Sequence, residues 1–264
     1  MIVDKINEYL SSSGKTIDEA ILADVASLAR WSFERQFGIR EEREVTKPYF
    51  SSIGRCLRQQ AYKILGFIEN GKEMDSRSKN VFFQGDMVEI AIIQVARLAG
   101  CNITACGKDQ ESVEWEGMRG RPDGILDGTH LVEAKSMTSY GFSEFQRGIL
   151  DEGYRYQCNA GMAALGLSAC VVVALNKDSG VLHEMVISKD DKIVADIKER
   201  IDTLAKATKE DLPYRPYQPD AKGFYPWQCR YCAFYKTCLP NTELVLVKNA
   251  YKLKQKELEN APTV

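Results

Sequence analysis

Two carboxylates and an amine stand close together in the segment GRPDGILDGTHLVEAK, residues 120–135. Asp123 comes ten residues before Glu133, and Lys135 follows two residues later. Across a short hairpin, such groups can hold a divalent ion and a water molecule side by side. This is the minimum equipment for hydrolysing a phosphodiester bond.

The turn of this hairpin decides whether the three side chains meet. A three-residue loop at 127–129, with Gly128 in the left-handed conformation, makes Asp123 face Glu133. Lys135 then shares their face because strand side chains alternate. A two-residue turn would place Glu133 on the opposite face. Facing carboxylates repel each other unless a cation lies between them, so we expect a metal site; the alternative is a surface hairpin with scattered charges.

A third carboxylate, Glu89, lies in the apolar stretch VFFQGDMVEIAIIQVARLA. A carboxylate among apolar side chains is costly unless it is paired or bound to a metal. Glu89 is therefore a candidate third ligand. The alternative is a glutamate on the exposed surface of a helix.

The eight cysteines fall into two groups. Four lie among apolar neighbours and are expected in the core, namely Cys101, Cys106, Cys158 and Cys170. Of the others, Cys229, Cys232 and Cys238 form C-x2-C-x5-C, and Cys56 lies far upstream. Four thiolates suit either zinc or a [4Fe-4S] cluster.

The neighbours of the close-spaced cysteines favour the cluster over zinc. No histidine lies nearby to complete a zinc-finger pattern, and four aromatic residues would shield a cluster from solvent: Trp227, Tyr231, Phe234 and Tyr235. The alternative is a loop rich in reduced cysteine.

The chain carries 35 Lys and Arg against 37 Asp and Glu, so no global basic field indicates a polyanionic partner. A local groove could still bind phosphates and stacked bases through five residues: Arg119, Arg121, Tyr154, Arg155 and Tyr156. The alternative is that these residues line solvated faces. No apolar run is long enough for a membrane span and the N-terminus has no signal-peptide layout, so we expect a cytoplasmic protein without membrane contact.

Periodicity predicts alternating helices and strands. Helices are expected at 3–12, 17–38, 52–66 (with Cys56 in its first turn), 154–165, 189–207 and 243–259. Strands are expected at 111–117, 118–126, 130–136, 169–176 and 181–188. A polar loop is expected at 69–78.

With Glu89, Asp123, the Glu133-x-Lys135 pair and a later glutamine on a helix, the chain resembles the PD-(D/E)xK nuclease superfamily. Its cysteines make it most similar to the RecB-type exonucleases that carry an iron-sulfur cluster. These include CRISPR-associated members and the related nuclease domain of AddB. The resemblance covers most of the chain but not its first 45 residues.

The resemblance implies an α/β fold with a restriction-endonuclease-like core, in which helices flank a central mixed sheet. An N-terminal helical layer would occupy residues 1–45 and the nuclease core residues 46–225. An iron-sulfur lobe with a tail helix would occupy residues 226–264, joined by Cys56.

The resemblance also implies roles for individual residues. Glu89 stands where many members have histidine, and it would hold Mg²⁺ or Mn²⁺ together with Asp123, Glu133 and the Ala134 carbonyl. Lys135 would orient or help deprotonate the attacking water.

Gln157 matches the glutamine of the family's QxxxY helix motif, whereas Gly161 occupies its tyrosine position. That departure leaves the DNA contact of this helix open to Tyr154 or Tyr156. The cluster ligands implied are Cys56, Cys229, Cys232 and Cys238.

The implied activity is a metal-dependent DNA exonuclease that acts 5′ to 3′ on single-stranded ends, in DNA repair, recombination or CRISPR adaptation. Its partners would be DNA and either further copies of itself or a recombination protein. Two alternatives stay open. One is a structure-specific or single-strand endonuclease on the same site, and the other is a catalytically idle, metal-stabilised DNA-binding module.

Overall fold

The computed structural model describes residues 1–38, 45–69, 76–248 and 250–256. By its contacts the chain divides into two compact units. The first unit comprises residues 1–43, 47–55 and 76–202, and the second comprises residues 44–46, 56–75 and 203–264. These units cut across the division expected at residues 45 and 225, because the segment that begins at Cys56 packs with the C-terminal part of the chain.

A five-stranded mixed sheet with the order β1-β4-β5-β6-β7 is the centre of the first unit. Its strands are β1 (Ile103–Thr104), β4 (Gly124–Leu126), β5 (His130–Met137), β6 (Ala169–Asn176) and β7 (Leu182–Ser188). The pair β5 and β6 is parallel, and the other neighbours are antiparallel. The predicted α/β fold with a central mixed sheet flanked by helices is confirmed.

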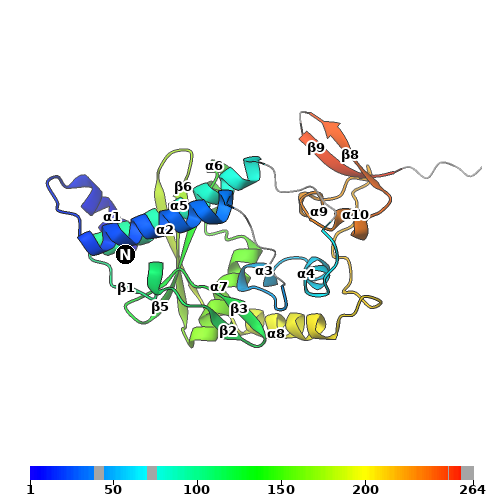
Figure 1. Ribbon diagram of the computed structural model, residues 1–264, viewed down its shortest axis with the longest axis horizontal. Coiled ribbons are helices and arrows are strands. Elements are labelled where there is room, and N and C mark those ends of the chain that lie inside the picture. The colour runs from blue at the N-terminus through cyan, green and yellow to red at the C-terminus, as the bar shows by residue number, and fades with distance from the viewer. Residues whose placement is uncertain (39–44, 70–75, 249, 257–264) are drawn as a thin grey trace, which may run out of the picture. The chain divides into compact units, whose positions relative to one another are not determined.

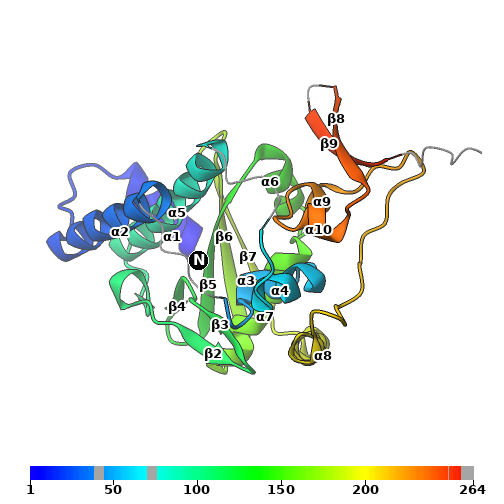
Figure 2. The ribbon, with the colours of Figure 1, turned by 45° about the vertical axis from the view of Figure 1, so that its right-hand side comes forward.

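Helices cover both faces of this sheet, as Figures 1 and 2 show. The helices of this unit are α1 (Ile2–Ser11), α2 (Glu19–Phe37), α3 (Phe50–Ile53), α5 (Ser76–Leu98), α6 (Ser139–Gln146), α7 (Glu152–Leu165) and α8 (Asp191–Lys206), with a short 3-10 helix η1 (Gly107–Asp109). Helix α2 packs on α5 and helix α3 packs on α7, whereas α5, α6 and α7 contact the sheet itself. Helix α8 runs from the first unit into the second.

The alternation of side chains along β5 divides the core into two layers. Val132 and Ala134 pack in the layer that includes α1 and α5, whereas Leu131 and Met137 pack in the layer that includes α6 and α7. The next strand, β6, reads ACVVVALN, a nearly continuous apolar run of the kind expected for a strand covered on both faces.

The predicted strand at 118–126 is interrupted. Its first part is β3 (Met118–Gly120), which pairs with β2 (Val113–Trp115) in a separate two-stranded sheet, and its last part is β4. Pro122 lies at the break, where a residue without an N–H group cannot continue a ladder. The predicted three-strand meander is therefore corrected to two hairpins.

The predicted helix at 52–66 is also interrupted. It consists of α3 and α4 (Leu57–Ile64), and Cys56 is the N-cap of α4 rather than a residue of its first turn. Gly54 lies between them against α7, where an added Cβ would come within 2.8 Å of the Tyr156 Cβ. Only glycine permits this close approach.

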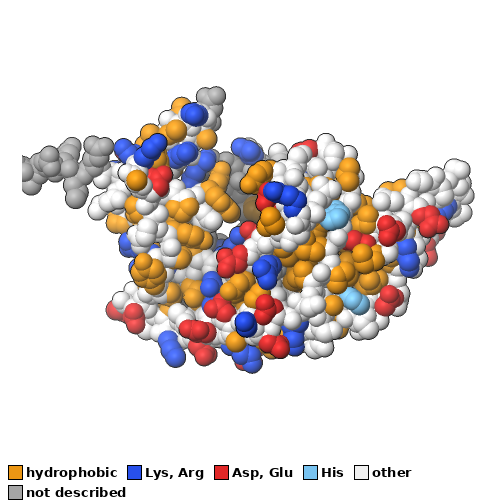
Figure 3. All heavy atoms as spheres, turned by 180° about the vertical axis from the view of Figure 1, so that it is seen from behind, with side chains coloured by type: hydrophobic (Ala, Val, Ile, Leu, Met, Phe, Trp, Pro, Cys, Tyr) orange, Lys and Arg blue, Asp and Glu red, His pale blue; other side chains and the backbone are white. Residues whose placement is uncertain are grey.

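The second unit contains α4, α9 (Trp227–Arg230), α10 (Tyr235–Cys238) and the hairpin β8 (Thr242–Val247) with β9 (Ala250–Gln255). The predicted tail helix at 243–259 is wrong: residues 242–255 form this hairpin, and residues 257–259 lie outside the described residues. Leu253 is fully buried between Lys252 and Lys254, an alternation that fits a strand. Figure 3 shows Lys and Arg side chains gathered with apolar ones around this hairpin.

Asp86 on α5 joins that helix to α2. Its carboxylate accepts hydrogen bonds from Ser32 Oγ (2.6 Å) and Gln36 Nε2 (3.1 Å) and pairs with Arg35. No helix in the described part of the chain combines the length and the apolar character that crossing a bilayer requires.

We expect Asp86→Ala to lower the free energy of unfolding by about 2–3 kcal/mol, because the buried Ser32 hydroxyl loses its acceptor on α5. Urea denaturation measures this change. Glu34→Ala, which removes an exposed ion pair of α2, is the control and should change stability by less than about 0.5 kcal/mol. Equal effects of the two substitutions would contradict this role for Asp86.

Candidate active site

The register of the β4–β5 hairpin agrees with the three-residue loop. Leu126 faces His130 and Gly124 faces Val132, so counting outward brings Asp123 opposite Glu133. Gly128 has a φ of 69°, and Asp127 is also left-handed, with a φ of 51°. The predicted register is confirmed for the paired residues 124–126 and 130–132. Asp123 and Glu133 lie just beyond the last pair, and they are close enough for the charge of Glu133 to raise the pKa of Asp123.

An open edge of β5 makes room for the candidate site. Because β4 pairs with β5 only as far as Val132, residues 133–137 have no partner strand on that side within the described chain. Asp123 fills part of this edge: its Oδ2 accepts the Ala134 N–H at 2.8 Å. A side chain thus satisfies a backbone donor that a longer β4 would have paired.

Glu133 is held from two directions. Its Oε1 accepts hydrogen bonds from Lys135 Nζ and from Gln157 Nε2 on α7. Both Glu133 and Asp123 are buried, at 2% and 8% exposure. Lys135 also lies 4.9 Å from the centre of the Tyr154 ring, a cation–π contact. The amine is thereby fixed beside the carboxylates.

Glu89 lies on α5, the helix that packs against the face of β5 that carries Val132 and Ala134. Burial, followed by the negative charge of Glu133, raises the pKa of Glu89 to about 7. Glu89 is half-buried and lines a cavity together with Asp123, which favours the ligand interpretation over a glutamate on the exposed surface of a helix.

The pKa shifts of Asp123 and Lys135 have the directions expected for charged groups that lie close together. Burial and the charges of Glu133 and Glu89 raise the pKa of Asp123 well above its usual range. Burial alone would lower the pKa of Lys135, but the attraction of Glu133 and Asp123 outweighs it, and the pKa is raised. Three crowded carboxylates beside one ammonium group leave excess negative charge that a divalent cation would neutralise.

We expect Glu89→Gln to stabilise the protein in buffer without divalent ions. The folded state raises the pKa of Glu89, so its ionised form costs stability as pH rises through about 7. The gain should be on the order of 1–3 kcal/mol at pH 8 and should vanish near pH 4. Chemical denaturation at the two pH values measures it. A variant no more stable than wild type at pH 8 would contradict this electrostatic account.

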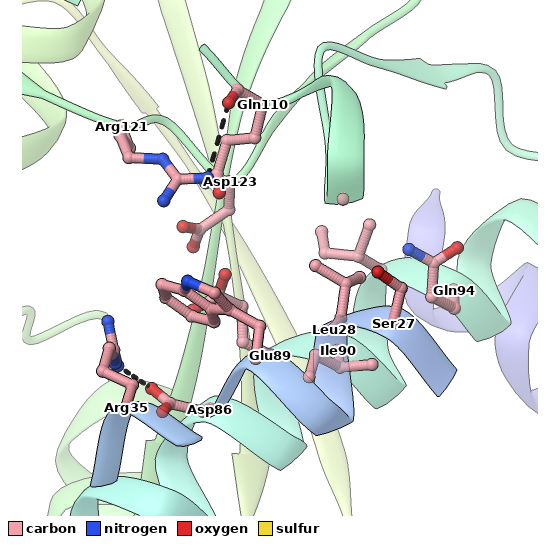
Figure 4. Close-up of a pocket in the computed structure, with 13 residues that line it drawn as sticks. Ser27, Leu28, Arg35, Asp86, Glu89, Ile90, Gln94, Gln110, Arg121 and Asp123 are labelled. Atoms are coloured by element: carbon pink, nitrogen blue, oxygen red, sulfur yellow. Dashed lines mark hydrogen bonds and ion pairs between the residues drawn. The ribbon is translucent and has the colours of Figure 1, made fainter. Parts of the chain in front are cut away.

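A cavity of about 310 Å³ lies above Glu89 and Asp123, and Figure 4 shows both carboxylates facing into it. Helix α2 supplies another wall through Trp31 and Arg35. Arg35 and Arg121 lie over the Trp31 ring at 4.4 and 5.6 Å from its centre. This wall was not predicted from the sequence, because the resemblance does not cover the first 45 residues. The only sequence signal for it is the spacing of Trp31 and Arg35, which lie about one helical turn apart.

The five candidate nucleic-acid-binding residues are in different environments. Arg121 is exposed at the cavity, and Tyr154 lies against Lys135. The Tyr156 hydroxyl donates to Asp196 Oδ2 at 2.6 Å, which directs this ring toward α8. The other two are Arg119, which pairs with the Tyr49 hydroxyl, and Arg155, which is exposed on α7.

Gly161 packs directly against the sheet. A Cβ at this position would come within 2.8 Å of Leu131 Cδ2. Glycine at this position, where the QxxxY motif has tyrosine, therefore allows α7 to pack closely against β5.

The four candidate cluster cysteines line one cavity of the second unit. Burial, followed by the charges of the other three thiols, raises the pKa of Cys229 to about 12. Burial likewise raises the pKa of Cys232 to about 11, with contributions from Cys56 and Cys238. The cavity between them is small, about 30 Å³.

The aromatic residues near these cysteines divide into two pairs. Phe234 and Tyr235 are buried, whereas Trp227 and Tyr231 are 60% and 64% exposed. Of the four aromatic residues expected to form an apolar shell around the cysteines, only Phe234 and Tyr235 are buried enough to do so. The other four cysteines of the chain are buried, as predicted for core residues.

Within the described residues, no three His, Cys, Asp or Glu side chains are positioned to hold one metal ion as they stand. In the first unit, one carboxylate oxygen of Asp123 accepts the Ala134 N–H, and one of Glu133 accepts from Lys135 and Gln157. Metal binding at either group of donors therefore requires the donors to turn toward a common centre.

No family model and no curated protein matches the chain. Among solved structures, an alkaline exonuclease from Laribacter hongkongensis is similar at 18% identity and a TM-score of 0.47, over 61% of this chain and 87% of that chain. Its complex with dAMP gives a TM-score of 0.48 at the same identity and coverage. A phage-related exonuclease from Haemophilus somnus 129PT gives 15% identity and a TM-score of 0.43, over 61% and 92%. Likeness this weak carries no argument about activity.

Proposed function

We propose that the chain is a metal-dependent deoxyribonuclease of the PD-(D/E)xK type. The observation that carries the proposal is the meeting of Glu89, Asp123 and Glu133 beside Lys135 at the open edge of β5. Buried like charges are costly, and a divalent cation is the simplest group that relieves them. Hard carboxylate oxygens suit Mg²⁺ or Mn²⁺.

The three carboxylates would hold the ion, together with the Ala134 carbonyl. In a strand, the N–H and C=O of one residue point to the same edge, and the Ala134 N–H points to Asp123. When bound, Mg²⁺ or Mn²⁺ would acidify a water molecule and neutralise the charge that develops on the phosphoryl oxygens.

The side chains around the carboxylates have supporting roles. Gln157 fixes the orientation of Glu133 from α7. Lys135, held between Glu133 and the Tyr154 ring, would orient the attacking water and add positive charge near the phosphate. Arg35 and Arg121 would contact phosphates, since both line the cavity.

The finer proposal is an exonuclease that acts 5′ to 3′ on single-stranded ends. Trp31 supports a single-stranded substrate because its ring is 43% exposed at a cavity with two arginines, which suits stacking on an unpaired base. Processing of DNA ends is a step shared by repair, recombination and CRISPR adaptation.

The test compares 5′-labelled linear, 3′-labelled linear and circular single-stranded DNA in the presence of Mn²⁺. We expect release of mononucleotides first from the 5′ end and no cleavage of circles. Cleavage of circles would replace the exonuclease with an endonuclease on the same site. Binding without any cleavage would overturn the enzymatic proposal in favour of an idle DNA-binding module.

We also propose that Cys56, Cys229, Cys232 and Cys238 bind a structural [4Fe-4S] cluster. Their convergence on one cavity supports a metal centre, and thiolates are ligands for iron-sulfur clusters and for zinc. A cavity of about 30 Å³ lined by four thiols also suits a single zinc ion once the thiols turn toward it, so zinc is the second candidate. Metal analysis with visible absorbance separates them: about four irons per chain and a brown colour indicate the cluster, whereas one zinc in a colourless protein overturns it.

A further inference from the structure

A second groove, of about 530 Å³, lies within the second unit. The residues of its lining that matter here are Phe224, Trp227, Arg230, Tyr251 and Lys252. One side is α9 and the preceding segment, and the other is β9. The groove is held in shape by backbone hydrogen bonds from Tyr225 N to Leu253 O (2.9 Å) and from Gln255 N to Gly223 O (2.8 Å).

Large aromatic side chains are exposed along this groove. Trp227 is 60% and Tyr251 is 53% exposed, and their rings do not belong to the buried cluster formed around Tyr235, Leu239 and Leu253. Exposed aromatic surface rimmed by polar residues indicates a binding face rather than a core.

The groove is lined by two cations, Arg230 and Lys252, and one anion, Asp220, and the segment around it is basic although the whole chain has a formal charge of −2. Between residues 222 and 256 there are seven Lys and Arg and one acidic residue, Glu243. Arg230 lies 4.6 Å from the centre of the Tyr231 ring, and Lys252 lies 5.5 Å from the centre of the Phe224 ring. Arg230 and Lys252 therefore line the groove together with the aromatic residues Phe224, Trp227 and Tyr251.

The acidic residue that lines this groove is engaged by the backbone. Asp220 accepts hydrogen bonds from the amides of Lys222 and Phe224, both at 2.9 Å, and the first of these interactions in magnitude, with Phe224, lowers the pKa of Asp220. The carboxylate of Asp220 stays ionised but is directed toward these two N–H groups, and Arg230 and Lys252 are the cations that line the groove.

We propose that this groove binds a single strand of DNA, with bases stacked on Trp227 and Tyr251 and phosphates contacted by Arg230 and Lys252. Stacking platforms lined with cations are how proteins hold unpaired nucleic acid without reading its sequence. A DNA duplex is a poorer ligand because its paired bases cannot stack on the exposed rings. An acidic protein is also a poorer ligand, because it would pair with the cations but would not supply bases to stack on the rings. The inference deepens the proposed function and rests on it for DNA as the polymer.

The test measures binding of a fluorescently labelled oligo-dT of about 20 nucleotides to the full chain, in buffer without divalent ions. Trp227→Ala should weaken binding by roughly 5- to 100-fold, the loss of one stacked base. Lys252→Gln should reduce the slope of log Kd against log salt by about 0.7. Tyr214→Ala is the matched control, because Tyr214 is a 77% exposed aromatic residue of the same unit that does not line the groove.

The partner is identified with three further probes. An abasic oligomer of the same length should bind more weakly than oligo-dT by at least the factor lost in Trp227→Ala, because it loses the bases stacked on both Trp227 and Tyr251, and a blunt duplex should compete poorly. Equal binding of the abasic oligomer, preference for duplex, or wild-type affinity in Trp227→Ala would each overturn the proposal. If the wild-type chain cleaves DNA but Trp227→Ala binds oligo-dT normally, the proposal for the groove is refuted and the nuclease proposal stands. If the wild-type chain neither cleaves nor binds DNA, both proposals are refuted.

Discussion

Asp123→Asn is expected to reduce the metal-dependent cleavage rate by at least about 10²-fold. Asparagine keeps the size of the side chain and can still accept the Ala134 N–H, so the hairpin should be preserved. The charge that would hold the cation is lost, and with it the stabilisation of negative charge on the phosphate.

The matched control is Asp127→Asn on the same hairpin. Asp127 is exposed in the turn with a left-handed φ of 51°, a conformation that asparagine accepts readily. Its cleavage rate should stay within about twofold of wild type, since the residue lies outside the cavity. Full activity in Asp123→Asn, or equal losses in both variants, would show that Asp123 is not a catalytic ligand.

Cys232→Ser is expected to release the metal centre of the second unit and to lower the free energy of unfolding by several kcal/mol. The metal-binding energy of a structural thiolate site is folding energy, and this unit has few buried apolar residues to replace it. Denaturation followed by circular dichroism, together with metal content, measures both effects.

The same substitution at a core cysteine separates metal loss from packing. Cys101 is 5% exposed in the first unit, so Cys101→Ser should cost some stability yet leave metal content unchanged. Unchanged metal content in Cys232→Ser would rule this thiol out as a ligand.

The β4–β5 hairpin could be predicted from sequence because its information is local. The loop Asp127-Gly128-Thr129 fixes the register, and the register fixes which side chains share a face. Likewise, the apolar run of β6 and the burial of the four dispersed cysteines follow from composition.

Other features depend on contacts that no local pattern records. The wall formed by Trp31 and Arg35 requires α2 to lie against α5, which Asp86 secures through side chains about fifty residues apart. The tail was predicted helical because its apolar residues fit both periods. The burial of Leu253 in the second unit decides in favour of the strand.

The proposed nuclease activity depends most directly on one divalent cation held by the carboxylates of the first unit. Calorimetric titration of Mn²⁺ into wild type and Glu133→Gln, each with its cysteine-bound metal in place, tests this claim. We predict a saturable site in wild type whose affinity falls at least about tenfold in the variant. Equal Mn²⁺ affinity in the two proteins, or no binding to wild type, would contradict it.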